Sequence, residues 1–133
     1  MDKYDPIQPP DPEVWLALDE GDRMALIAAF HQTDRLGPRL EPAGANMHTV
    51  LHAIVENQAA MGDETPVRLK LRQLVAQGLD RHDAIHCIAS VLAEQLSNVV
   101  KRPHSKRATG GEEAYFPAVR RLNARNWLRS ARR

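Results

Sequence analysis

The stretch that decides the fold is DRHDAIHCIASVL, residues 80–92. Its apolar side chains recur every three or four residues, as at Ile85 and Ile88, and this period predicts an amphipathic helix. Asp80 supplies an N-terminal cap, and we expect the helix to continue to about Lys101. No segment of the chain has the strict alternation of a half-buried β-strand, so the sequence predicts an all-α protein.

Five further segments carry the same helical period. Asp11-Pro12 and Thr65-Pro66 each place an N-cap residue before a proline at the first helical position, and Gly78 supplies a C-terminal stop. We expect these other helices at about 12–18, 20–35, 47–61, 66–77 and 112–129. Short connections between helices are typical of a compact bundle, here of about five or six short helices.

Length and proline content divide the chain into parts. Its 133 residues suit one domain, and four of the nine prolines lie in the first twelve residues. We expect an extended proline-rich arm at 1–12, a helical core at 13–101, a basic linker at 102–111 and an arginine-rich C-terminal helix packed on the core at 112–133. A chain of this length can bury a core without a metal or disulfides, so a metal site would point to function more than to folding.

Composition excludes several classes of protein. No apolar run approaches the length of a membrane span, and Met1–Pro12 lacks the apolar core of a signal peptide. Cys87 is the single cysteine, which excludes an intramolecular disulfide framework and suits a reducing compartment. We therefore expect a cytoplasmic protein that makes no use of a membrane.

A net charge of +1 hides two opposite parts. Residues 1–100 have a formal charge of −7 and residues 101–133 one of +8. Arg121, Arg125 and Arg129 form a row along the last predicted helix, and such a row can contact nucleic-acid phosphates or an acidic partner. It can equally dock on the acidic body of the same chain, which the near-cancellation of charge favours.

Two histidine pairs are the strongest chemical signal. His48-x3-His52 recurs 34 residues later as His82-x3-His86, and Glu56 extends the first row by one turn. Residues four apart share a helix face, so each pair can chelate one divalent ion. One predicted helix separates the two rows, so we expect their helices to run roughly parallel, with the histidines at one level.

Facing one another, the two rows would make a nitrogen and oxygen site for Zn, Fe, Mn or Ni. His48, His52, His82 and His86 are the predicted metal ligands, and Glu56 is either a ligand or the catalytic general base. An open ligand position would allow hydrolytic or oxidative chemistry, because the ion lowers the pKa of bound water. In the structural alternative, these histidines cap neighbouring carbonyl groups or pair with acids.

Two other candidates are assigned structural roles. His31 lies on the apolar stripe of its helix, so we expect a core histidine whose ring is hydrogen-bonded. Cys87 points about 100° away from its neighbour His86 on the helix and is a poor co-ligand.

Four segments have a familiar pattern: YDPIQPPDPEVWLALDEGDR (4–23), NMHTVLHAIVENQAAMGDETPV (46–67), QGLDRHDAIHCIASVL (77–92) and AYFPAVRRLNARNWLR (114–129). Together they resemble the uncharacterised bacterial family called domain of unknown function 1841. The resemblance spans nearly the whole chain and is most specific around His48–Val67 and Gly78–Leu92. It implies a short, helical, cytoplasmic protein and brings no established activity, cofactor or partner.

The leading hypothesis is a helical protein that binds a divalent metal in a His/Glu cleft. The alternative is a non-enzymatic module whose basic C-terminus binds RNA, the ribosome or an acidic protein. In a third possibility, the seams between helices mediate homo-oligomerisation.

Overall fold

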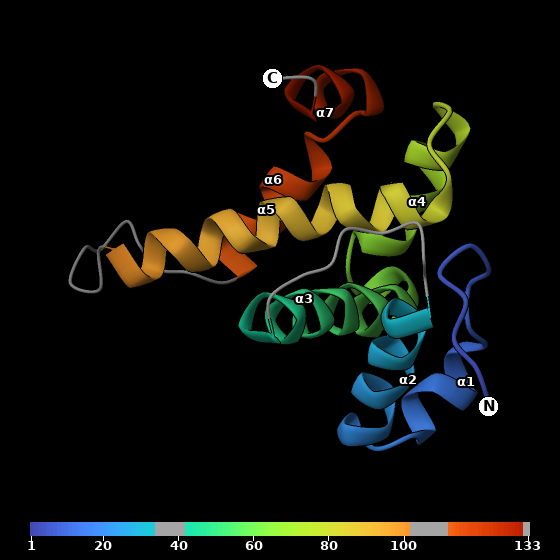
Figure 1. The fold of residues 1–133 in the computed structure, drawn as a ribbon. Helices are drawn as coiled ribbons and strands as arrows, with labels where there is room; N and C mark the ends of the chain where they lie inside the picture. The colour runs from blue at the N-terminus through green and yellow to red at the C-terminus, as the bar shows by residue number, and fades with distance from the viewer. Residues whose placement is uncertain (34–41, 102–111, 132–133) are drawn as a thin grey trace.

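The computed structural model describes residues 1–33, 42–101 and 112–131. In these ranges the chain forms seven α-helices, one 3-10 helix and no strand, which confirms the all-α prediction (Figure 1). The elements are α1 (Pro12–Ala17), α2 (Glu20–Thr33), α3 (Pro42–Ala60), η1 (Gly62–Glu64), α4 (Val67–Ala76), α5 (Arg81–Lys101), α6 (Glu112–Arg120) and α7 (Ala124–Ala131). None of the described helices is long and apolar enough to cross a membrane. The predicted linker at 102–111 lies outside the described residues.

Local sequence signals set several helix ends. Asp11 caps α1 by accepting two backbone N–H groups, and Asp80 caps α5 by accepting the N–H of Asp83 at 2.7 Å. Gly62 follows α3 with a φ of 67°, and Gly78 follows α4 with a φ of 110°. Glycine adopts these left-handed conformations at little cost, so both residues stop a helix where the sequence predicts a stop.

Two predicted boundaries are wrong. The helix expected from about Met47 begins at Pro42, where proline favours the first helical position. The single helix expected at 112–129 is two helices, α6 and α7. Asn123 separates them, because its side chain accepts the N–H of Asn126 at 2.8 Å and caps α7.

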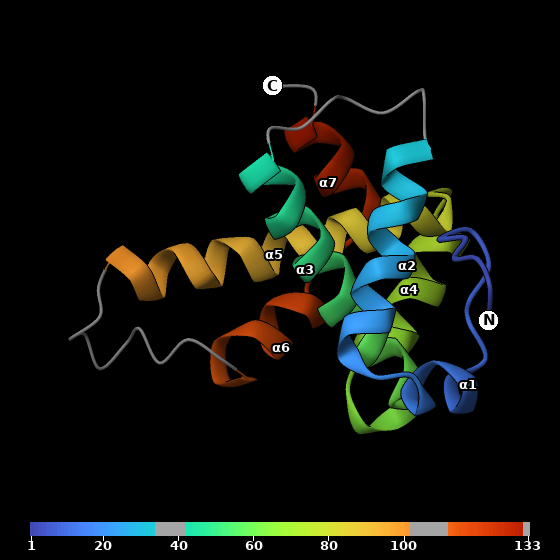
Figure 2. The same cartoon turned by 60° about the horizontal axis from the view of Figure 1, so that its bottom comes forward.

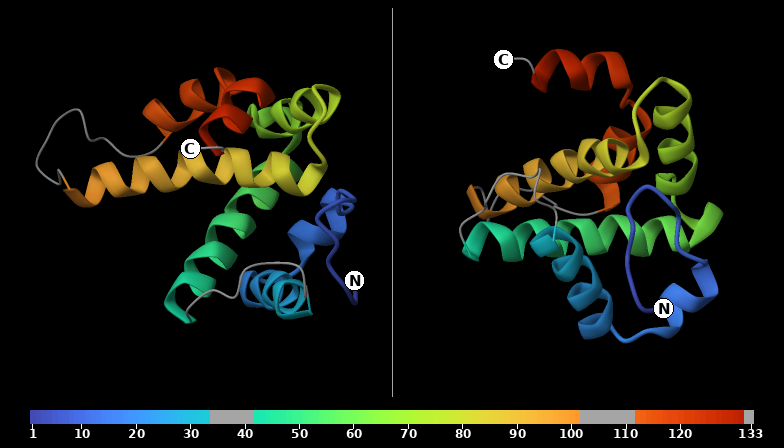
Figure 3. Two further views of the ribbon diagram at one scale, coloured as in Figure 1. Left: turned by 45° about the horizontal axis from the view of Figure 1, so that its top comes forward. Right: turned by 45° about the vertical axis from the view of Figure 1, so that its right-hand side comes forward.

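The central element is α3, which contacts α1, α2, α4 and α5. Figure 2 shows it between α2 and α5, and Figures 1 and 3 show α5 crossing it in the opposite sense. The expected parallel arrangement of α3 and α5 is therefore wrong. The right-hand view of Figure 3 gives the reason, because α4 stands across one end of both helices and does not run alongside them.

Both faces of α3 are buried in apolar clusters. The larger cluster joins Val55 and Ala59 to the inner faces of α4, α5, α6 and α7. The smaller cluster joins Ala53 to Tyr4, Trp15 and Ile27 from the N-terminal part of the chain. The polar side chains of the candidate site lie along the α3 stretch that connects these clusters.

The C-terminal helices pack on the rest of the protein through apolar contacts and the hydrogen bonds of Lys70. Tyr115 and Val119 are buried, and Lys70 Nζ donates to the carbonyl groups of Arg120 and Leu122 at 2.9 Å each. The predicted partner-binding arginines are all exposed: Arg121, Arg125 and Arg129. None of them forms an ion pair with an acid in the described ranges. The two C-terminal helices are therefore held by apolar contacts and hydrogen bonds, and these three arginines take no part in ion pairs with described acids.

Candidate metal centre

All five histidines that the structure describes gather where α2, α3 and α5 meet. They are His31 from α2, His48 and His52 from α3, and His82 and His86 from α5. Neighbouring ring centroids in this cluster lie between 4.3 and 5.9 Å apart. The i,i+4 spacing explains the pairs within α3 and α5, and the crossing of the two helices brings the pairs together.

Four of the five form a tighter group. One ring nitrogen from each of His31, His52, His82 and His86 lies within 4.8 Å of the other three. In a tetrahedral zinc site, with bonds of 2.0–2.1 Å, ligand nitrogens are about 3.3 Å apart. Side-chain shifts of at most about 1.5 Å between the farthest atoms would therefore bring this group to bonding geometry.

The tautomer of His52 follows from its hydrogen bonds. Tyr4 donates its O–H to Glu56, so its oxygen must accept from His52 Nε2, which lies 2.7 Å away. With the proton on Nε2, neutral His52 carries a bare lone pair on Nδ1. That atom is buried and has no hydrogen-bond partner among the described residues. His52 therefore offers Nδ1 as a ligand atom.

His31 is oriented in a similar way. Its Nδ1 lies 2.8 Å from the carbonyl oxygen of Ile27, which can only accept, so Nδ1 carries the proton. Its Nε2 then accepts a hydrogen bond from His48 Nε2 at 2.9 Å. The Nε2 lone pair of His31 is therefore taken by His48, and a metal ion at His31 Nε2 would replace this hydrogen bond.

Three histidines of the cluster favour the neutral imidazole. Burial, and then the neighbouring imidazoles, lower the pKa of His48 and of His86 to about 4 and that of His52 to about 2. Buried His86 Nε2 also lacks a hydrogen-bond partner within the described ranges. Only a neutral imidazole can bind a metal ion, so the lowered pKa values of His52 and His86 suit them as ligands.

Glu56 has other partners. Its carboxylate accepts two hydrogen bonds from Arg81, at 2.6 and 2.8 Å, and one from Tyr4. Glu56 is 1% exposed, and burial together with this carboxylate raises the pKa of Tyr4, which keeps its proton. Arg81, Glu56, Tyr4 and His52 thus form a continuous buried chain. Such partners orient a histidine ligand and fix its tautomer.

The structure brings His52, His82 and His86 together as the sequence predicts, and it places His48 next to them. Glu56 lies outside the group of four. The ring of His31 is hydrogen-bonded as expected, and His31 also lies inside the group. The position of His31 on the apolar face of its helix indicated in the sequence that its ring points inward. Nothing local marked Tyr4, which reaches the site from the proline-rich arm.

No protein-family model, curated protein or solved structure matches this chain. The resemblance to the domain of unknown function 1841 family therefore stays a prediction.

Proposed function

We propose that this protein binds one divalent transition-metal ion through His31, His52, His82 and His86. The observation that supports the proposal is the approach of four imidazole nitrogens, from three helices, to within 4.8 Å of one another. His52 Nδ1 and His86 Nε2 are buried without a hydrogen-bond partner among the described residues, which destabilises the metal-free protein, and a metal ion would bind both atoms. A single ion would also join α2 to α3 and α5.

The donor set favours zinc among the metals considered. Neutral imidazole nitrogens suit Zn, Cu, Ni and Fe, whereas Mn prefers carboxylate oxygens. The carboxylate oxygens of Glu56 are already held by Arg81 and Tyr4. Four histidines would fill a tetrahedral zinc shell, which is the arrangement of sites that bind metal without catalysing a reaction. The proposed function is therefore metal binding.

The test is metal analysis of protein purified without an affinity tag, followed by zinc titration against a competing chelator. We expect about one equivalent of zinc per chain, and a loss of at least tenfold in affinity for His82→Ala and for His86→Ala. Asp63→Asn is the control, because it changes an exposed side chain that is not part of the histidine cluster. Binding of less than about 0.1 equivalent, or equal affinity in all three variants, would refute the proposal.

The exposed arginines favour a second candidate, binding of a polyanion such as RNA. Arg121, Arg125 and Arg129 stay exposed and form no ion pair with a described acid. Replacing all three with glutamine keeps the apolar docking of α7. If these arginines contact phosphates, the variant binds RNA more weakly. The slope of the logarithm of the binding constant against the logarithm of the salt concentration then falls by the share of about three phosphate contacts. An unchanged salt dependence would show that these arginines do not contact RNA phosphates.

A further inference from the structure

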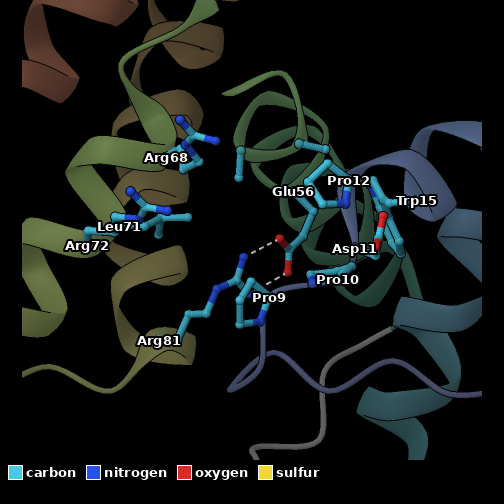
Figure 4. A pocket seen from close by; sticks show the side chains of 12 residues that line it. Pro9, Pro10, Asp11, Pro12, Trp15, Glu56, Arg68, Leu71, Arg72 and Arg81 are labelled. Carbon is cyan, nitrogen blue, oxygen red and sulfur yellow. Dashed lines mark hydrogen bonds and ion pairs between the residues drawn. The ribbon is translucent and has the colours of Figure 1, made fainter. Parts of the chain in front are cut away.

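A pocket separate from the histidine cluster lies where the N-terminal arm approaches α4 and the start of α5. Its volume is about 330 Å³, which is at the lower end for small-molecule sites. Figure 4 shows arginine side chains on one side of it and the proline-rich arm with α1 on the other. The pocket therefore has a wall of arginine side chains and, opposite it, a wall formed by the proline-rich arm and α1.

The apolar wall is rigid. Pro9, Pro10 and Pro12 line it, and buried Trp15 stands behind them. Trp15 Nε1 donates to Asn57 Oδ1 at 2.9 Å, which fixes the indole. Proline rings and a fixed indole lose little conformational entropy when they contact a ligand, so this wall suits a flat apolar group.

The opposite wall is cationic. Arg68 and Arg72 come from successive turns of α4, and Arg81 comes from the first turn of α5. Arg81 is already bound to Glu56. Arg68 forms only an exposed ion pair with Asp63, at 2.8 Å, and such pairs are readily exchanged.

The pocket lining has three arginines and two carboxylates, so its formal net charge is +1. Asp11 uses its carboxylate to cap α1, and Glu56 is held by Arg81 and Tyr4. Arg72 forms no ion pair with any acid in the part of the chain that the structure describes. An arginine beside a pocket with an apolar wall attracts a ligand that carries one anionic group on an apolar body.

We propose that this pocket binds a small organic acid, with its carboxylate on Arg72 and Arg68 and its apolar body against Pro9, Pro10 and Pro12. A guanidinium can donate two parallel hydrogen bonds to a carboxylate, which sets the orientation of the ligand. The volume accommodates a single ring with a short substituent. The site uses no residue of the histidine group, so the two proposals stand or fall separately.

The experiment is a titration of the metal-free full chain with benzoate, followed by heteronuclear NMR of the backbone amides. We expect saturable shifts at the arm and at α4, and affinity for benzamide at least tenfold weaker because it lacks the charge. Phenyl phosphate and inorganic phosphate distinguish an organic acid from a phosphate ligand. Tighter binding of inorganic phosphate than of benzoate would overturn the assignment to organic acids.

Arg72→Gln tests the cationic wall, and Arg120→Gln is the matched control, since it removes an exposed arginine charge at the end of α6. We expect Arg72→Gln to weaken benzoate binding about tenfold and Arg120→Gln to leave it unchanged. Circular dichroism verifies that both variants fold. Equal affinity in the two variants, or equal affinity for benzoate and benzamide, would overturn the proposal.

Discussion

Replacing Glu56 with glutamine tests the buried chain behind the histidines. The Glu56 carboxylate is 1% exposed and binds Arg81, whose side chain is 10% exposed, through contacts of 2.6 and 2.8 Å. Removing one charge of a buried pair leaves the other uncompensated and costs about 3–5 kcal/mol. Because Arg81 also donates to the Pro6 carbonyl group, we expect the lower end, about 3 kcal/mol.

The assay is urea unfolding of the metal-free protein, followed by circular dichroism. A loss of about 3 kcal/mol moves the midpoint down by about 2 M for a domain of this size. Asp63→Asn is the matched control, because Asp63 pairs with Arg68 at 2.8 Å while its side chain is 92% exposed. That surface pair contributes at most about 1 kcal/mol.

Comparing Glu56→Gln with Asp63→Asn also distinguishes a structural role of Glu56 from a role as metal ligand or general base. A residue of the buried chain stabilises the protein with no metal present, whereas a metal ligand or general base has no reason to do so. A Glu56→Gln variant that loses less than about 1 kcal/mol, or no more than Asp63→Asn, would refute the reasoning.

Three further predictions follow from the same contacts. Tyr4→Phe removes the acceptor of His52 Nε2, so zinc affinity in a chelator competition should fall about tenfold, and an unchanged affinity would count against tautomer control. The lowered pKa values of His48, His52 and His86 mean that the unfolded chain takes up protons first as the pH falls, so the metal-free protein should become less stable between pH 6.5 and 5, by up to about 5 kcal/mol for the three histidines together, and a flat profile in urea unfolding would contradict this. Lys70→Met leaves two carbonyl groups beside α6 without their donor and should destabilise the protein by about 2 kcal/mol, with faster amide exchange in α6 and α7.

The helices could be predicted because their signals are local. Asp11, Asp80 and Gly78 act on the backbone within a few residues, and the apolar period is visible in any short window. The direction of α5 against α3 is not local, because it depends on how the short helix α4 packs across both. The C-terminal segment forms two helices because Asn123 caps the second one. The helical apolar period runs on through Asn123, so the period alone predicted a single helix.

The candidate site could be predicted only in part. The i,i+4 spacing identified His52, His82 and His86, since that spacing fixes a shared face within one helix. The inclusion of His31 depends on how α2 packs on α3, and the partners of Glu56 depend on Tyr4, 52 residues earlier. Contacts across such separations are set by tertiary packing, which periodicity does not describe.

The measurement that tests the central claim most directly is X-ray absorption spectroscopy of the protein loaded with one equivalent of zinc. If His31, His52, His82 and His86 bind the ion, the spectrum should show about four nitrogen ligands at 2.0–2.1 Å, with the multiple scattering of imidazole rings. The His31→Ala variant should lose one imidazole from that shell. A shell dominated by water or carboxylate oxygens, or one unchanged in His31→Ala, would contradict the account.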